Sequence, residues 1–323
     1  MTEPLDVLLL LALPASGKSE VRRYLASQSA DACRREFFLN PTVQLDDYPY
    51  VHMMRRISQE LRTLGSDTVF FDSDDLPLKH PRDWGTLIEL LNEDFDDLAA
   101  ARRVAPASAS AWLLGRLDTA RAKVGLPAAL AALPTKIRGA LEQAIATDAQ
   151  KVVADRNAEV PTRLAGHTVV MEFARGGPEG ATMPLAAPYG YRHALSLLSD
   201  TILSRASILY VWVAPEESRR KNRERADPND QGSILNHGVP ETVMRAEYGC
   251  DDMGYLVDAS DRPNHVRIES RGKVFHLPLA RFDNRVDKTS FVRRDPESWR
   301  PEEVKPLHAG LTQALATLAR VRG

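Results

Sequence analysis

The sequence predicts an α/β fold with a mostly parallel central sheet. The unbroken apolar run at residues 7–13 is typical of a strand that is buried on both faces. Similar runs recur at residues 169–171 and 207–213, and segments with helical spacing lie between them. Acidic residues follow several of these runs, and open parallel sheets bind their ligands beyond the carboxyl ends of the strands. The pattern therefore predicts helices on both faces of the sheet and a site at one edge.

The turn after the first run has the composition of a phosphate-binding loop. Small residues there let backbone N–H groups cradle phosphate oxygens, and the helix that follows presents its positive end. Lys18 is expected to reach the outer phosphates, and Ser19 to offer its hydroxyl to Mg²⁺. We therefore expect ATP and Mg²⁺ as cofactors. The expected cofactor-binding residues are Pro14, Ala15, Ser16, Gly17, Lys18, Ser19 and Glu20.

A strand, a tight turn, Gly-Lys-Ser and a helix, in this order, make up the P-loop. The sequence departs from the full pattern at Ala12, where that pattern has glycine. The alternative interpretation is an ordinary strand-to-helix turn that happens to contain Gly-Lys-Ser. The apolar run before the turn and the helical spacing after it favour the P-loop.

Composition limits the class of protein. The 323 residues suffice for one large α/β domain with an insertion or for two domains. A formal charge of -2 gives no reason to expect general nucleic-acid binding. Two distant cysteines indicate a reducing, cytoplasmic compartment without a disulfide framework. No apolar stretch approaches the roughly 20 residues of a membrane span, so we expect no membrane partner.

Two short strand-like runs near the first helix end in acids. Residues 42–45 lead into Asp46 and Asp47, and residues 68–71 read as a second strand that ends at Asp72. Acids at strand ends are candidates for magnesium binding or for general base. Asp46 or Asp47 is expected to accept the proton of an acceptor hydroxyl, with Asp72 or Asp74 as substitutes. The alternative is that these acids are solvated turn or capping residues.

A third acid follows the apolar run at residues 169–171. Glu172 would face the phosphate loop if its strand neighbours the first one, and it could then hold Mg²⁺ through water. Ser19, Glu172 and Asp72 are thus the expected magnesium residues. Arg175 could reach a phosphate, although a lone arginine is more often a surface ion-pair partner.

A helix that begins at Pro215 is rich in arginine. Arg219, Arg223 and Arg225 follow two glutamates, and a polar loop comes next. Arginines on a mobile lid would neutralise the charge on a transferring phosphoryl group, so we expect these three to be catalytic. The alternative is a solvated basic face.

The remaining segments suggest a division of the chain. Residues 1–75 and 166–290 would form the nucleotide-binding core, and residues 76–165, with three helical stretches, an insertion on the acceptor side. Residues 291–323 would form a helical segment, with leucines along one side that either dock on the sheet or make a dimer contact.

With these motifs in place, the chain resembles the P-loop nucleoside and metabolite kinases of the uridine kinase and phosphoribulokinase type. The P-loop is the specific motif, and the order of the other motifs agrees with the family. They are Leu45-Asp46-Asp47-Tyr48, His80-Pro81-Arg82-Asp83-Trp84, Val169-Val170-Met171-Glu172 and the arginine-rich segment 208–225. The resemblance implies a three-layer P-loop kinase fold and transfer of the γ-phosphoryl group of ATP to a hydroxyl of a nucleoside- or sugar-like small molecule.

Two other functions remain open from the sequence. One is a nucleotide-dependent switch that contacts a partner through the helical insertion. The other is a kinase that acts on a nucleic-acid end or on a phosphorylated or macromolecular acceptor. A GTPase is disfavoured because the sequence has no Asn-Lys-x-Asp tetrad. The insertion carries no motif that identifies the acceptor, and a homodimer is neither indicated nor excluded.

Overall fold

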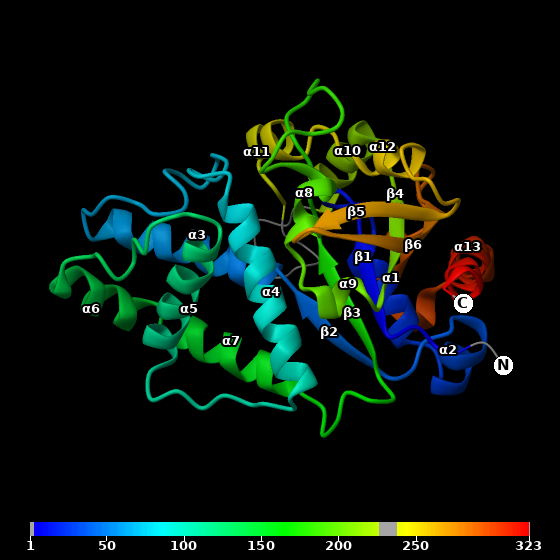
Figure 1. The fold of residues 1–323 in the computed structure, drawn as a ribbon, viewed down its shortest axis with the longest axis horizontal. Helices are drawn as coiled ribbons and strands as arrows, with labels where there is room; N and C mark the ends of the chain where they lie inside the picture. The colour runs from blue at the N-terminus through cyan, green and yellow to red at the C-terminus, as the bar shows by residue number, and fades with distance from the viewer. Residues whose placement is uncertain (1–2, 226–237, 323) are drawn as a thin grey trace.

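A six-stranded sheet lies at the centre of the computed structural model, which describes residues 3–225 and 238–322. The strand order is β2-β3-β1-β4-β6-β5, and every neighbouring pair is parallel except β5 and β6. The predicted α/β class with a mostly parallel sheet is confirmed (Figure 1). The strands are β1 (Val7–Leu11), β2 (Thr42–Asp46), β3 (Thr168–Phe173), β4 (Ala206–Trp212), β5 (His265–Ser270) and β6 (Lys273–Asp283).

Strand β1 is buried on both faces because helices cover both sides of the sheet. Its Val7, Leu9 and Leu11 side chains join one apolar cluster, and Leu8 and Leu10 join another on the opposite face. The first cluster is covered by α4 (Asp83–Ala99), α8 (Gly190–Leu197), α9 (Asp200–Leu203) and α12 (Met253–Asp258). The second is covered by α1 (Lys18–Ala26) and α13 (Pro301–Val321), with α2 (Ala30–Glu36) beside them. The sheet is thus the middle of three layers (Figure 1).

The C-terminal helix docks on the sheet. Its predicted leucine stripe is buried against β4 and β6 rather than left on the surface. The buried leucines are Leu307, Leu311, Leu315 and Leu318.

A group of helices lies beyond the edge strand β2, and all of them belong to the connection between β2 and β3 (Figure 1). They share an apolar cluster with the outer side of α4 and with α11 (Glu241–Glu247). They are α3 (Tyr48–Thr63), α5 (Ala109–Lys123), α6 (Thr135–Ala144) and α7 (Ala146–Glu159). Helix α3, which precedes residue 76, therefore packs with the helices that follow it.

The structure differs from the predicted elements at two places. Residues 68–71 form no strand; they are part of a loop, and Phe71 donates its backbone N–H to Ser58 of α3. Strand β5 was not predicted from the sequence, and it forms a hairpin with β6 through Arg271 and Gly272, which both have positive φ.

The remaining helical segments flank the carboxyl edge of the sheet or lead into α13. They are α10 (Pro215–Arg225) and the short turns η1 (Ser290–Arg293) and η2 (Pro296–Ser298). Among the residues that the structure describes, no helix is both long and apolar enough to cross a membrane.

Candidate active site

The loop between β1 and α1 turns sharply, and its geometry requires glycine at one position. Gly17 has φ +103°, a conformation that residues with a side chain rarely adopt. A Cβ at this position would lie 2.5 Å from Thr289 Oγ1 and 2.9 Å from Asn284 Nδ2. Ala15 also has positive φ, at 55°. The backbone therefore folds back on itself immediately before α1.

The backbone N–H groups at the start of helix α1 border a cavity. The first helical hydrogen bond runs from Val21 N to Gly17 O, and no side chain among the described residues caps the helix. The N–H groups of Lys18, Ser19 and Glu20 precede this bond, and such groups bind anions readily. The Lys18 ammonium crosses the loop and donates to the carbonyl oxygens of Ala12 (3.1 Å) and Leu13 (3.3 Å).

The cavity beside this helix lies at the carboxyl edge of the sheet. Strands β1 and β3 are neighbours, but the chain leaves β1 toward β2 on one side and leaves β3 toward β4 on the other. Open α/β sheets bind ligands at such a reversal of direction. All seven expected loop residues line the cavity, and so do three of the expected acids. The acids are Asp46, Asp47 and Glu172.

Asp46 and Glu172 form one ionic cluster. They lie opposite each other on β2 and β3, and Arg22 of α1 donates to both carboxylates at 2.9 Å. Burial raises the pKa of Asp46 to about 7, the Glu172 carboxylate adds to this shift, and Arg22 opposes it. The second oxygen of Asp46 accepts from Tyr48 N at 2.8 Å. Both oxygens of Asp46 are thus held within the protein.

Asp47 is placed differently, although it is the next residue. Its Oδ2 accepts from Arg175 at 2.6 Å, and both side chains are at least nine-tenths buried. Burial raises the pKa of Asp47, and the charges of Arg175 and Lys18 oppose this shift. Within the described residues, its Oδ1 makes no hydrogen bond. The structure therefore separates the two acids, and Asp47 keeps an oxygen for a ligand.

Arg175 is a buried partner of Asp47 rather than a surface residue. Its guanidinium also donates to Trp84 O at 3.1 Å and lies 4.9 Å from the centre of the Trp84 ring. Arg175 therefore links Asp47 to α4, and it does not line the cavity.

The residues present fit Mg²⁺ only together with phosphate oxygens. Ser19 and Glu172 line the cavity next to the helix N-terminus. In the described ranges, 3–225 and 238–322, no three His, Cys, Asp or Glu side chains are arranged to hold a metal ion. Magnesium usually binds one or two protein oxygens, several waters and substrate phosphates, so this donor set suits a nucleotide-bound ion.

Three predicted side chains have other roles. Asp72, which was predicted to bind Mg²⁺ or to substitute as the base, does not line the cavity; it is exposed and pairs with Lys79 at 2.9 Å. Residues 68–71 before it form a loop rather than a strand, so the structure does not bring Asp72 together with the other predicted site residues. Asp74 pairs with Arg62 at 2.7 Å. The Glu20 carboxylate is bound by Arg293 at 2.6 Å, so only the backbone of Glu20 is available to a phosphate.

Two of the three predicted arginines of α10, Arg219 and Arg223, have partners outside the cavity. Arg219 pairs with Glu216 (3.3 Å) and Glu179 (3.4 Å), and Arg223 lies 3.4 Å from Glu241. Neither lines the cavity. The side chain of Arg225 and residues 226–237, which include the predicted polar loop, lie outside the described residues. Helix α10 does contact the phosphate loop, because Ser218 Oγ donates to Pro14 O at 2.7 Å.

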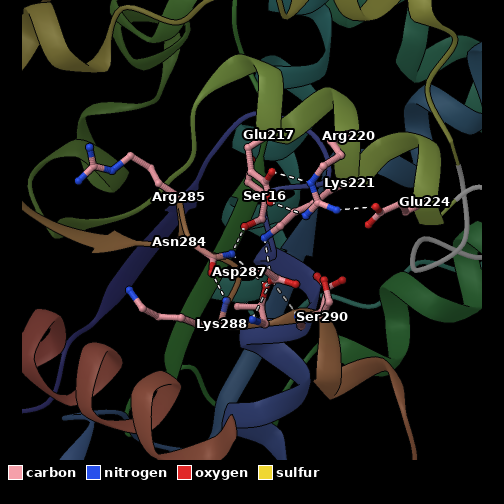
Figure 2. Close-up of polar contacts among 12 residues, drawn as sticks. Ser16, Glu217, Arg220, Lys221, Glu224, Asn284, Arg285, Asp287, Lys288 and Ser290 are labelled. Carbon is pink, nitrogen blue, oxygen red and sulfur yellow. Dashed lines mark hydrogen bonds and ion pairs between the residues drawn. The ribbon is translucent and has the colours of Figure 1, made fainter.

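A segment after β6 braces the phosphate loop from behind. Asn284 is fully buried and donates to Ser16 O at 2.8 Å, and Asp287 binds the buried ammonium of Lys221 on α10 at 2.8 Å. Figure 2 shows Asn284, Asp287 and Lys221 converging next to Ser16, while Arg285 points away. The Arg285 guanidinium lies 3.7 Å from the centre of the Trp212 ring.

The rest of the lining of the same cavity was not predicted. It consists of a buried glutamate, an arginine, and aromatic and apolar side chains from α3, α4, α11, the residues on either side of α11 and the loop after α3. These residues are Tyr48, Val51, Arg55, Phe71, Trp84, Val239, Val243, Glu247 and Tyr248. We call this set the acceptor-side chamber.

No family model, curated protein or solved structure matches this chain. A function for this chain therefore has to be inferred from the geometry of the cavity.

Proposed function

We propose that this protein is an ATP- and Mg²⁺-dependent kinase that transfers the γ-phosphoryl group to a hydroxyl of a small molecule. One observation carries the proposal. A glycine-dependent loop, a helix N-terminus that no described side chain caps, and Lys18 share a single cavity with the strand-end carboxylates Asp47 and Glu172. Few ligands other than a nucleotide polyphosphate need an anion cradle directly opposite two acids.

Each residue of the cavity has its own role in the proposed phosphoryl transfer. The N–H groups at the start of α1 bind phosphate oxygens, and Lys18 exchanges the carbonyls of Ala12 and Leu13 for the outer phosphates. Ser19, with Glu172 through water, would hold Mg²⁺, which neutralises charge on the phosphates when bound. Asp47 Oδ1 accepts the proton of the acceptor hydroxyl as the new O–P bond forms and the bond to the β-phosphate oxygen breaks. Positioning and electrostatics supply most of the catalysis.

The test removes the Lys18 ammonium and is designed to leave the fold intact. We expect Lys18→Ala to lower ATP turnover by about 10³-fold or more, since a preorganised charge on the phosphates is lost. ADP release and phosphorylated product are measured across a panel of hydroxyl compounds, and circular dichroism checks folding. Lys305→Ala, on the exposed side of α13, is the matched control and should keep full activity.

Two outcomes would contradict the proposal. Undiminished phosphoryl transfer by Lys18→Ala would remove the phosphate loop from the reaction. Slow ATP hydrolysis that no acceptor stimulates would favour the nucleotide-dependent switch instead.

A further inference from the structure

Glu247 is a buried carboxyl that the proposed reaction does not use. It is the last residue of α11, it is 2% exposed, and it lines the same cavity as Lys18 and Asp47. A carboxyl in this position is expensive to bury unless it is paired or hydrogen-bonded. The contacts of Glu247 therefore indicate its role.

The hydrogen bonds of Glu247 use only one of its two oxygens. Oε1 accepts from Leu78 N at 3.1 Å and from Trp84 Nε1 at 3.2 Å. Within the described residues, Oε2 makes no hydrogen bond, and no ion pair reaches the carboxyl. Burial raises the pKa of Glu247 to about 7. The ionised carboxylate thus lacks a donor for Oε2.

The two nearest arginines are engaged elsewhere. Arg175 is held by Asp47 at 2.6 Å, and Arg55 donates to Asp74 O at 2.8 Å. The Arg55 guanidinium also lies 4.1 Å from the centre of the Phe71 ring. Among the described residues, neither arginine forms an ion pair with Glu247, and Oε2 keeps an acceptor position for a ligand.

The walls around Glu247 suit a flat group. Trp84 and Tyr248 meet edge to face, with ring centres 5.6 Å apart and planes at 69°. Phe71, Val51 and Val243 complete an apolar lining. Apolar and aromatic walls with one fixed polar group are typical of small-molecule sites, where the polar group sets orientation.

We propose that the acceptor carries a flat ring with an N–H donor, which packs against the aromatic side chains of the chamber and donates to Glu247 Oε2. The acceptor hydroxyl then lies toward Asp47 and the phosphate loop, at the other end of the cavity. This assignment rests on the proposed function, because it names the second substrate of the same site. Glu247 is a specificity-determining residue and takes no part in bond making.

The proposal predicts that compounds with an amino group bind more tightly than their N,N-dimethyl derivatives, which have no N–H donor at that position. The probes are cytidine, adenosine and 3-aminobenzyl alcohol, each compared with its N,N-dimethyl derivative, and ribose serves as the probe without a ring. Binding is measured by calorimetry on the full chain with a non-hydrolysable ATP analogue and Mg²⁺ present. We expect at least one amine to bind about 10-fold or more tightly than its dimethyl counterpart, since a buried carboxylate left unpaired disfavours the latter.

The variant Glu247→Gln tests the role of the second oxygen, Oε2. Its amide oxygen can still accept from Leu78 N and Trp84 Nε1, while an NH₂ group replaces Oε2. We expect the preference for amine over dimethylamine to fall to about unity, with affinity for the ATP analogue unchanged. Glu241→Gln, on the same helix but outside the cavity, should keep the full preference. The thermal unfolding midpoint of each variant shows whether the fold is retained.

Failure of this inference differs from failure of the kinase proposal. If the ATP analogue binds but no amine binds better than its dimethyl counterpart, or ribose binds better than the ring compounds, the role of Glu247 is overturned and the kinase proposal stands. An unchanged preference in Glu247→Gln also overturns it. If neither the ATP analogue nor any probe binds, both proposals fail.

Discussion

The two ends of the cavity are built in opposite ways. The proposed phosphate end is one continuous stretch, residues 14–20, in which the backbone N–H groups at the start of α1 border the cavity. The acceptor-side chamber takes its walls from separate segments, with Phe71, Trp84 and Glu247 far apart in the chain. Phosphate is common to all nucleotides and can be bound by local backbone geometry, whereas an acceptor needs side chains that only the tertiary fold assembles. One end therefore indicates a reaction class, and the other indicates a substrate.

The loop and the strand-end acids of the cavity also differ in what holds them. The loop between β1 and α1 is braced by buried neutral groups, such as Asn284 and Ser218, which donate to its carbonyl oxygens. The acids are held by charges, with Arg22 on Asp46 and Arg175 on Asp47. Changes at the loop should therefore act through packing, and changes among the acids through charge.

The largest effect is expected from the acid that keeps a free oxygen. Asp47→Asn should slow phosphoryl transfer by about 10²–10⁴-fold, because the proton acceptor is lost, and should leave ATP affinity within a few-fold. Asp46→Asn should have a smaller effect, since both Asp46 oxygens are already bound by Tyr48 N and Arg22. Single-turnover rates and nucleotide binding measure both variants. If Asp46→Asn transferred the phosphoryl group more slowly than Asp47→Asn, Asp46 would be the residue that accepts the proton.

A smaller effect is expected at the loop itself. Gly17→Ala should lower the free energy of unfolding by about 1–3 kcal/mol, because it combines positive φ with a clash against Thr289. Gly65→Ala is the matched control: its φ is +66°, and nothing lies within 4 Å of the added Cβ. It should lose only about 1 kcal/mol. Urea unfolding measures both; equal losses would mean that the brace behind the loop does not restrain Gly17.

The same contrast explains what could be predicted from the sequence. Lys18 and Ser19 follow a buried strand at fixed spacing, and Glu172 lies at the shared edge because parallel strands end there. Asp72 was misassigned because the aromatic and β-branched residues before it resemble a strand, while in the fold they are a loop buried against α3. The helix with Arg219 was predicted, but its partner Glu179 comes from a distant segment.

Glu247 shows the limit of sequence reasoning most clearly. In the sequence it is one acid in an ordinary helical segment, and no spacing marks it. Its role depends on Leu78 and Trp84, which lie more than 160 positions earlier in the chain. The hairpin strand β5 was missed for a different reason: its alternating pattern is exposed on one side, whereas the other strands were recognised as continuous apolar runs.

The smallest predicted effect uses pH to separate the buried acids from those at the surface. The pKa of Asp46 is raised to about 7 by burial and by Glu172, so between about pH 4 and pH 7 the folded protein holds a proton that the unfolded chain has lost. The free energy of unfolding should therefore fall as pH rises through this window. The pKa of Asp283 is instead lowered to about 2 by its hydrogen bonds with Arg285, so its contribution is lost only as pH falls below about 4.

Asp46→Asn tests this assignment without touching the surface. Urea unfolding at pH 5, 6, 7 and 8 should show wild-type stability declining by about 1–2 kcal/mol more than that of the variant, after allowance for the coupling of Asp46 to Glu172 and Arg22. Asp283→Asn should leave this decline intact, because its difference in stability from wild type should stay constant between pH 5 and pH 8 and disappear only as the pH falls below about 4. Parallel pH profiles for wild type and Asp46→Asn would mean that Arg22 keeps Asp46 ionised throughout, and the site would then carry a permanent carboxylate beside the phosphate loop.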